Sequence, residues 1–274
     1  MFSPYYAWAR QRDPLADPLR HCALNVALYG RGGHRWAMTE RSGERVTRSA
    51  DALCIGPSSI AWEGDVLVLH VDEVTAPRPS RIRGVVGLHP AALADCAYAL
   101  DAAGRHRWSP IAPRARVEVD LDRPGLSWRG TGYLDSNAGD RPLAEDFTGW
   151  DWSRASLTGG RSAVLYDVTR RSGDVLSLAL QFDADGRTHP FAPPPVAALP
   201  ASAWRVARGT RSDAGTAART LQRLEDGPFY ARSVLEAQWL GEPVTAVHES
   251  LSLSRFNAGW VRLLLPFRMP RRSG

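Results

Sequence analysis

Short runs in which polar and apolar residues alternate are the strongest signal in this sequence. Residues 114–122, RARVEVDLD, place a charged side chain at every second position and alanine, valine or leucine at the others. Side chains two residues apart lie on the same face of a β-strand, so this run predicts a strand with one buried and one solvated face. Residues 65–74, 176–182 and 250–254 predict further strands.

Glycine-containing turns separate the predicted strands, as at residues 63–65 (EGD) and 172–174 (SGD). Helical patterns are short and are confined to residues 90–99 and 213–223. Many short strands with frequent turns are typical of β-sandwiches and β-barrels. The fold class is therefore predicted to be all-β, built as two β-barrel or sandwich domains.

The proline-rich segment 189–203, HPFAPPPVAALPASA, marks the best domain boundary. Proline cannot donate a hydrogen bond within a sheet, so these residues do not fit a central strand. We predict an N-terminal domain at 1–188, which carries the catalytic motifs, and a C-terminal domain at 189–274. The alternative is a long surface loop within a single domain.

All 34 basic residues are arginine, because the sequence contains no lysine. This absence excludes Schiff-base catalysis, a pyridoxal-phosphate anchor and the phosphate-binding lysine of a Walker-A loop. A GC-rich genome is the simplest explanation of the bias. The net charge is +5, but the arginines are scattered without a nucleic-acid-binding motif. We therefore expect no nucleic-acid partner.

Cysteine and histidine show no metal-binding pattern. Cys22, Cys54 and Cys96 lie far apart without a CxxC motif, and none of the seven histidines has HxH or HExxH spacing. We expect small core cysteines in a reducing compartment, and no metal site. Motifs for a serine-hydrolase elbow or a dinucleotide loop are also missing.

No stretch has the length of an apolar transmembrane span, and no signal-peptide pattern opens the sequence. We therefore expect a protein that is soluble or peripherally attached to a membrane. Residues 2–10, FSPYYAWAR, are expected to form strand and pocket material.

The segment 130–154 concentrates residues that can carry chemistry. It contains an acid, an amide and three aromatic residues around a glycine-rich turn, namely Asp135, Asn137, Tyr133, Trp150 and Trp152.

Tyr133 and Asp135 are two residues apart, and so are His106 and Trp108 in an earlier segment. Each pair shares a strand face, and one predicted strand lies between the two pairs. We therefore expect the four side chains to line one cavity on neighbouring strands.

An acid beside aromatic rings has a specific use, the protonation of an unactivated double bond. The ordinary pKa of aspartate, about 3.9, would leave only about one carboxyl in a thousand protonated at neutral pH. Burial must raise this pKa by about three units, a cost of about 4 kcal/mol. Trp108 and Tyr133 would stabilise the resulting carbocation, and His106 would accept a proton from the attacking water.

Each of these residues also has a purely structural interpretation. Asp135 precedes Ser-Asn-Ala-Gly and could cap a turn by bonding to its own backbone. His106 is flanked by two arginines and could be a surface residue, whereas the tryptophans could simply pack in the core.

The motif GYLDSNAGDRPL followed by GWDWSRA resembles the carotenoid 1,2-hydratases, also called hydroxyneurosporene synthases. FSPYYAWAR, HCALNVALYG and RWAMTER near the start resemble the same family, so the similarity covers most of the first 170 residues. Residues 135–139 read Asp-Ser-Asn-Ala-Gly where the wider superfamily often has Asp-His-Asn-Trp-Gly, and this departure resembles the hydratase branch. Members of the family usually have further strand material before FSPYYAWAR.

The resemblance implies two lipocalin-like β domains and cofactor-independent addition of water to the C1–C2 double bond of acyclic carotenoids such as neurosporene and lycopene. It assigns catalysis to His106, Trp108, Tyr133 and Asp135, and we add Asn137, Trp150 and Trp152 as substrate-binding residues.

Because a polyene is insoluble in water, we expect peripheral membrane contact through residues 1–12 and 261–272, on the cytoplasmic side of the inner photosynthetic membrane. Ordinary terminal strands with frayed basic ends are the alternative for both segments. No oligomeric state is predicted.

Three other functions remain open from the sequence. A lipocalin-like protein can bind lipids or terpenoids without catalysis. An enzyme of the same fold could cyclise a polyene or remove water from a terpenoid alcohol. Asp135 and Glu145 could also serve as the acid pair of a glycosidase, although they lack a recognisable motif.

Overall fold

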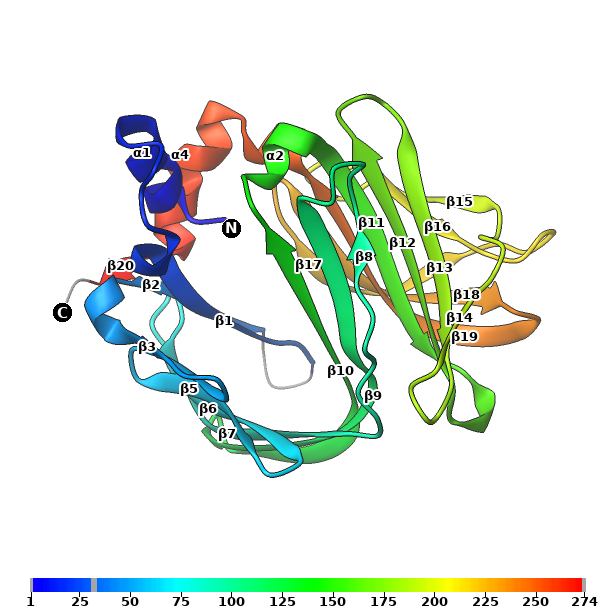
Figure 1. The fold of residues 1–274 in the computed structure, drawn as a ribbon, viewed down its shortest axis with the longest axis horizontal. Helices are drawn as coiled ribbons and strands as arrows, with labels where there is room; N and C mark the ends of the chain where they lie inside the picture. The colour runs from blue at the N-terminus through cyan, green and yellow to red at the C-terminus, as the bar shows by residue number, and fades with distance from the viewer. Residues whose placement is uncertain (1, 31–33, 273–274) are drawn as a thin grey trace. The chain divides into compact units, whose positions relative to one another are not determined.

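The computed structural model describes residues 2–30 and 34–272. Strands make up most of the described chain (Figure 1), which confirms the predicted all-β class. Each sheet of these residues has two edge strands, so none closes into a barrel.

The chain divides into two compact units. Unit 1 consists of Met1–Pro90, Arg116–Gly132 and Arg262–Gly274, and unit 2 consists of Ala91–Ala115 and Tyr133–Val261. These units do not coincide with the predicted division at 188/189, because strands from both sides of that position pair within one sheet of unit 2. The two units are groups of residues in mutual contact, and this does not show which segments fold independently. The boundary at 188/189 therefore stays a prediction.

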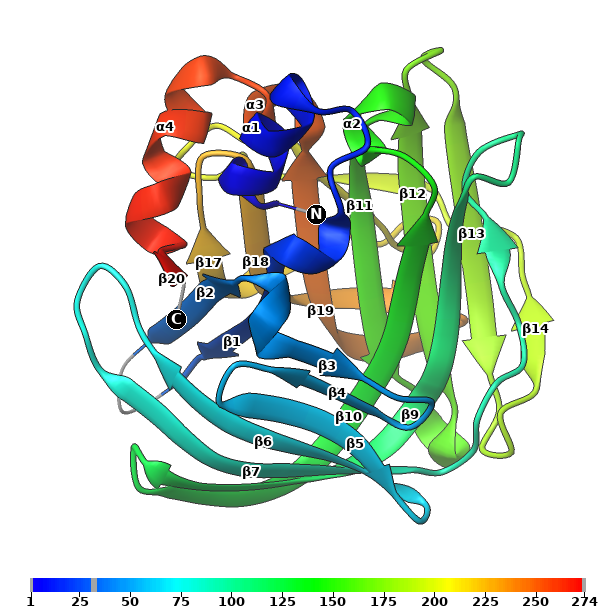
Figure 2. The ribbon, with the colours of Figure 1, turned by 60° about the vertical axis from the view of Figure 1, so that its left-hand side comes forward.

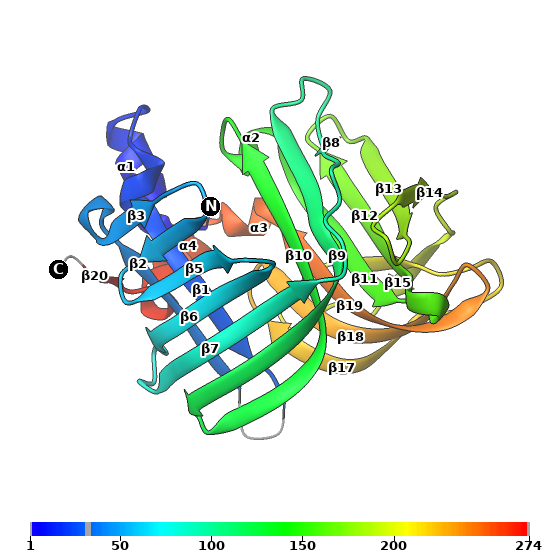
Figure 3. The same ribbon diagram turned by 60° about the horizontal axis from the view of Figure 1, so that its bottom comes forward.

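Unit 1 contains a three-stranded sheet, ordered β1-β2-β20, and the larger part of a sheet ordered β10-β9-β7-β6-β5-β4-β3. Figure 3 shows β5, β6 and β7 side by side. The strands are β1 (Cys22–Leu28), β2 (Arg35–Arg41), β3 (Val46–Arg48), β4 (Ala52–Ile55), β5 (Ser58–Glu63), β6 (Val66–Val74), β7 (Arg81–Pro90), β9 (His106–Arg123), β10 (Leu126–Gly139) and β20 (Arg271–Arg272). The predicted strands at 65–74 and 114–122 are confirmed within β6 and β9.

Unit 2 is built on a seven-stranded antiparallel sheet ordered β14-β13-β12-β11-β19-β18-β17 (Figure 2). The first residues of β9 and the last of β10 also belong to this unit, and β8 pairs with β9. The remaining strands are β8 (Tyr98–Ala99), β11 (Phe147–Ser156), β12 (Ser162–Arg170), β13 (Val175–Phe182), β14 (Thr188–Pro190), β15 (Val196–Leu199), β16 (Arg208–Arg211), β17 (Arg219–Asp226), β18 (Tyr230–Trp239) and β19 (Glu242–Ser252). The prediction at 176–182 is confirmed as β13.

Helices are short in the described chain. They are α1 (Pro4–Arg12), α2 (Leu143–Asp146), α3 (Leu253–Phe256) and α4 (Gly259–Arg268), together with the 3-10 turns η1 (Pro18–His21), η2 (Gly43–Arg45) and η3 (Thr158–Gly160).

Three local predictions are wrong. Residues 4–12 form helix α1 instead of a strand, because Pro4 starts the helix and the Ser3 hydroxyl caps it by accepting from the Tyr6 amide. Residues 90–99 contain the end of β7 and the strand β8 instead of a helix, and residues 213–223 form a turn that leads into β17. The strand expected at 250–254 ends at Ser252, whose hydroxyl caps α3.

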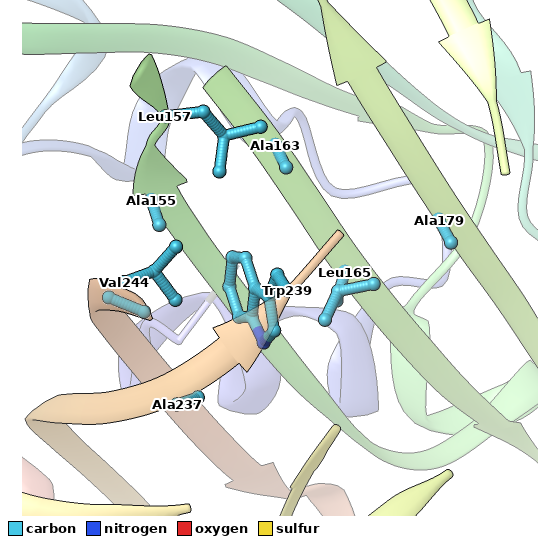
Figure 4. Close-up of a cluster of buried hydrophobic side chains, with 9 residues drawn as sticks. Ala155, Leu157, Ala163, Leu165, Ala179, Ala237, Trp239 and Val244 are labelled. Carbon is cyan, nitrogen blue, oxygen red and sulfur yellow. The ribbon is translucent and has the colours of Figure 1, made fainter. Parts of the chain in front are cut away.

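One face of the seven-stranded sheet holds a hydrophobic core centred on Trp239 (Figure 4). Alanines at 155, 163, 179, 237 and 246 leave room for the indole, which has no solvent exposure. The indole Nε1 donates to the Arg211 carbonyl oxygen at 2.8 Å, and Phe191 packs against the cluster. The proline-rich segment that was predicted as a linker therefore lies on this face of the sheet.

Polar contacts also hold β16, the strand that follows this segment and pairs with β15 inside it. The Gly209 amide donates to Asp151 Oδ1 at 3.2 Å, and the Arg211 guanidinium forms an ion pair with Asp167 at 2.8 Å. Asp151 and Asp167 are paired on β11 and β12, so both carboxylates lie on the core side of the sheet. The candidate site uses side chains on the opposite face of this sheet, such as Trp152 and Tyr166.

Truncating Trp239 to alanine should destabilise the protein by about 3–5 kcal/mol, because it leaves a cavity and an unpaired carbonyl. Val175→Ala, at a position that is 52% exposed, should change the free energy of unfolding by no more than about 0.5 kcal/mol. Urea unfolding followed by circular dichroism measures both. A loss below about 1 kcal/mol for Trp239→Ala would contradict the central place of this residue.

Candidate active site

Asp135 is the centre of a polar group on β9 and β10, which are neighbouring strands. Its Oδ2 atom accepts a hydrogen bond from the Trp108 indole Nε1 at 2.7 Å and a second one from the Tyr133 hydroxyl at 3.1 Å. Tyr133 and Asp135 share a face of β10 because they are two residues apart. The structure therefore brings together three of the four predicted catalytic side chains.

The two donors also define where a proton can reside on Asp135. Both hydrogen bonds end on Oδ2, so in the neutral acid this oxygen is the acceptor. The acidic proton is then carried by Oδ1.

Aromatic rings surround this carboxyl group. The Trp152 ring lies 5.3 Å from the Tyr133 ring, and the Tyr166 ring lies 5.4 Å from the Trp108 ring, measured between ring centroids. Trp152 and Tyr166 are directly paired on β11 and β12, so both rings project from the same face of the sheet. The aromatic surface around Asp135 is thus shared between β9, β10 and the seven-stranded sheet.

Burial is the main electrostatic influence on Asp135. It raises the pKa of this carboxyl group, and the nearby charge of Glu249 raises it further. The hydrogen bonds from Trp108 and Tyr133 favour the charged form and oppose this shift, but they do not cancel it. The pKa of Tyr133 is raised in turn, first by burial and then by the charge of Asp135, so its hydroxyl remains a donor.

His106 is bound to a different carboxylate, Asp146, and not to Asp135 in the described chain. In the part of the chain that the structure describes, its ring hydrogen-bonds to Asp146, with Nε2 2.8 Å from Oδ2, and packs against Phe147. Arg141 also binds Asp146 and holds the pKa of this carboxyl well below its usual range. The imidazole is therefore oriented by a second carboxylate and is almost fully buried, at 1% exposure.

Gly139 on β10 lies directly against the His106 ring. A Cβ atom at this position would come within 2.5 Å of Nδ1, so a side chain would displace the imidazole. Nδ1 itself is buried and, within residues 2–30 and 34–272, has no hydrogen-bond partner.

The predicted substrate-binding residues are placed differently from one another. Trp152 is in contact with the Tyr133 ring, as described above. Trp150 lies two residues earlier on β11 and faces the same side of the sheet. Asn137 is exposed near the end of β10, two residues beyond Asp135.

The sequence interpretation missed several residues at this site. Arg154 lies over the Tyr133 ring, with its guanidinium carbon 5.8 Å from the ring centroid, and burial lowers its pKa. Tyr166 and Glu249 come from β12 and β19, and only the pairing of these strands with β11 brings them to the site. Asp146 follows an ordinary polar stretch and has no spacing that marks it.

Neither a metal site nor a membrane-spanning helix is found within residues 2–30 and 34–272. No group of three or more histidine, cysteine, aspartate or glutamate side chains is arranged to hold a metal ion. No helix of this part of the chain has both the length and the apolarity that crossing a bilayer requires.

Comparison with known proteins decides the family. The model of a protein family described as carotenoid hydratase CrtC matches residues 1–274. The chain belongs to the carotenoid hydratase family. It is accordingly an enzyme of the hydro-lyase class.

Individual members of the carotenoid hydratase family are similar over the whole chain. The acyclic carotenoid 1,2-hydratase of Thiocapsa roseopersicina is 54% identical over 275 residues, which cover 100% of this chain and 67% of that protein. The enzyme of the same name from Rubrivivax gelatinosus is 50% identical and is covered to 68%. The enzyme from Cereibacter sphaeroides is 41% identical and is covered to 96%.

Two solved structures share the fold at low sequence identity. A putative AttH from Nitrosomonas europaea has a TM-score of 0.58 at 17% identity, covering 83% of this chain and 80% of that one. CghA with Sch210972 has a TM-score of 0.51 at 13% identity, covering 84% of each chain. These structures support the predicted lipocalin-like β architecture of this carotenoid hydratase family member.

Replacing Trp108 with phenylalanine should raise the pKa of Asp135 further. The change removes the Nε1–H donor, which favours the charged carboxylate, and keeps an aromatic ring. A ¹³C-NMR titration of the Asp135 carboxyl carbon, assigned with Asp135→Asn, measures the shift. Trp150→Phe is the matched control and should leave the titration unchanged. A lower pKa in Trp108→Phe would contradict this account of the site.

Proposed function

We propose that this chain adds water to the terminal C1–C2 double bond of acyclic carotenoids such as neurosporene and lycopene, giving tertiary 1-hydroxy carotenoids. Relatives named acyclic carotenoid 1,2-hydratase support this reaction. The single observation that carries the proposal is the raised pKa of Asp135 inside a wall of aromatic rings. A neutral carboxylic acid in an apolar environment is the group that protonation of an alkene requires.

The reaction begins with transfer of a proton from Asp135 Oδ1 to C2. The π electrons of the double bond form the new C–H bond, and C1 becomes a tertiary carbocation. Trp108 and Tyr133 face this cation, and each ring stabilises it by up to about 2 kcal/mol where water is excluded. Water then adds at C1 because the tertiary position carries the charge.

The reaction needs no cofactor, since addition of water changes no net oxidation state. The proton comes from an acid that the chain supplies, and the charge is stabilised by rings that the chain supplies. Trp152 extends the aromatic wall, and we keep Trp150 and Asn137 as substrate-binding residues on the same faces of β11 and β10.

His106 is proposed as a positioning residue. Its Nε2 is engaged by Asp146, and its ring packs against β10 at Gly139, two strand positions beyond Asn137. This arrangement fixes the end of β10 relative to β9, on which Trp108 lies. Acceptance of a proton from water by His106 stays a prediction.

Among the other functions considered, a non-catalytic carrier is the main rival. A carrier for an apolar ligand gains nothing from an uncharged acid with two hydrogen-bond donors on one oxygen. It would bind lycopene, leave it unchanged and tolerate the loss of Asp135.

Asp135→Asn should reduce hydration at least about 10³-fold while the fold survives, because an amide cannot supply the proton. The assay incubates lycopene with the protein in ¹⁸O-labelled water and detects the hydroxylated product by mass spectrometry. Asp185→Asn, at an exposed turn, is the control and should keep full activity. Appreciable turnover by Asp135→Asn would remove this residue from the acid role, and binding without turnover by the wild type would favour the carrier.

We further propose that the protein collects its substrate at the cytoplasmic side of the inner photosynthetic membrane. Helix α4 presents Trp260, Leu263, Leu264 and Phe267 on one face, and Leu263 and Phe267 are 69% and 70% exposed. Exposed apolar patches of this kind are typical of interaction surfaces. Arg268 and Arg272 are exposed and supply positive charge for anionic lipids, whereas Arg271 is paired with Glu40.

The N-terminal segment contributes less to this proposal than the sequence suggested. Residues 4–12 form α1, whose apolar side chains are half-buried, so the exposed face of α4 is the main contact.

A Leu263→Ser/Phe267→Ser variant should co-sediment with anionic liposomes at least about fivefold less than the wild type, because it removes the most exposed apolar side chains of α4. Leu221→Ser, which removes an exposed leucine of β17, is the control and should sediment as the wild type does. Equal sedimentation of all three proteins would contradict the role of α4.

A further inference from the structure

Glu249 lies in a row of side chains that crosses the seven-stranded sheet. Trp152 on β11 is directly paired with Tyr166 on one side and with Glu249 on the other, and Glu249 is in turn paired with Arg232 on β18. Directly paired residues of antiparallel strands project from the same face. Glu249 therefore faces the same side as the aromatic residues of the site.

The same face carries the contacts of Asp135. The Trp152 ring packs against Tyr133 and the Tyr166 ring packs against Trp108, and these are the two residues that donate to Asp135. The charge of Glu249 is also close enough to raise the pKa of both Asp135 and Tyr166. Two carboxyl groups thus flank one aromatic surface.

The partners of these two carboxyl groups differ in charge. Asp135 receives hydrogen bonds from two neutral groups, an indole and a phenol. Glu249 forms an ion pair with Arg232, whose Nη2 donates to Oε1. Arg232 is itself positioned by a 2.9 Å hydrogen bond from its Nε to the Tyr230 hydroxyl. The ion pair engages Oε1 and leaves Oε2 as the other acceptor of Glu249.

We propose that Glu249, positioned by Arg232, binds the attacking water and accepts its proton. This inference rests on the proposed function and deepens it, because it supplies the base that hydration needs opposite the acid. Acids and bases of one site are commonly two carboxyl groups that the protein places in contrasting environments.

Asp135 gives its proton to C2, and the C1–C2 π bond supplies the electrons of the new C–H bond. A lone pair of water forms the C1–O bond, and one proton of that water passes to Glu249 Oε2. Glu249 then releases a proton to solvent, to which its side chain is 21% exposed, and Asp135 takes one up. The net change is addition of one water molecule.

Glu249 fits this step better than His106 does. The His106 ring is 1% exposed and its Nε2 is bound to Asp146, whereas Glu249 is partly open to solvent. The titratable and charged groups near Glu249 on this face include Arg232 and Tyr230 of β18, Glu225 of β17, Arg154 of β11, Tyr166 of β12 and, through its effect on the pKa, Asp135 of β10.

The test compares Glu249→Gln with the wild type in lycopene hydration across pH. The variant keeps the shape of the side chain but cannot accept the proton, so kcat should fall at least about 10²-fold while KM changes less than about threefold. The acidic limb of the wild-type pH profile should disappear. The alkaline limb, which reflects ionisation of Asp135, should remain.

Glu236→Gln is the matched control. Glu236 also forms a cross-strand ion pair with an arginine, Arg219, but this arginine lies on the edge strand β17. This variant should keep the wild-type kcat and both limbs of the wild-type pH profile. If Glu236→Gln also lost activity, the effect of Glu249→Gln would reflect a general need for cross-strand ion pairs in this sheet, and the proposal would be overturned.

Glu249→Gln with wild-type kcat, or with its acidic limb intact, overturns the proposal. If circular dichroism shows that this variant does not fold, Glu249→Asp decides, because it retains a carboxylate set back by one methylene. The Glu249→Asp variant should have a reduced kcat, and the acidic limb of its pH profile should match that of the wild type. Full activity of this variant would overturn the role of Glu249. Absence of any hydroxylated product from the wild type would instead remove the proposed function itself.

Discussion

Burial of Asp135 opposes its ionisation, while the indole and the phenol that donate to its Oδ2 favour the charged form. The pKa of this carboxyl group results from the balance of these effects, and burial outweighs the two hydrogen bonds. The donors nevertheless satisfy a buried oxygen that would otherwise lack partners, and so they hold the acid in one orientation. The rings of Trp152 and Tyr166 complete this arrangement because strand pairing places them beside the donors.

The sequence predicted the centre of the site because a two-residue period is a local property. Side chains at 106 and 108, and at 133 and 135, share strand faces whatever the rest of the chain does. Tyr166, Glu249 and Asp146 could not be predicted in this way. They reach the site only through the register of β12, β19 and the segment before β11, and register depends on contacts between residues far apart in the chain.

The errors in secondary structure have identifiable causes. The aromatic residues after Ser3 suggested a strand, yet a serine followed directly by proline is a helix start, and α1 begins there. The proline-rich segment suggested a boundary because proline interrupts sheets. In the structure Phe191 of this segment packs against the core around Trp239, and β15 within the segment pairs with β16, so the segment covers one face of the seven-stranded sheet. The domain boundary itself stays a prediction. Composition alone does not distinguish a linker from a covering segment.

The hydrogen-bonding of Asp135 has a stereochemical consequence. Since Oδ2 is occupied by both donors, the proposed proton transfer to C2 starts from Oδ1, on one side of a substrate that would lie against the rings. In the proposed reaction the two faces of C2 are therefore not equivalent, and the methylene formed there would receive its new hydrogen at a single prochiral position. C1 bears two identical methyl groups, so the alcohol itself records nothing of this choice.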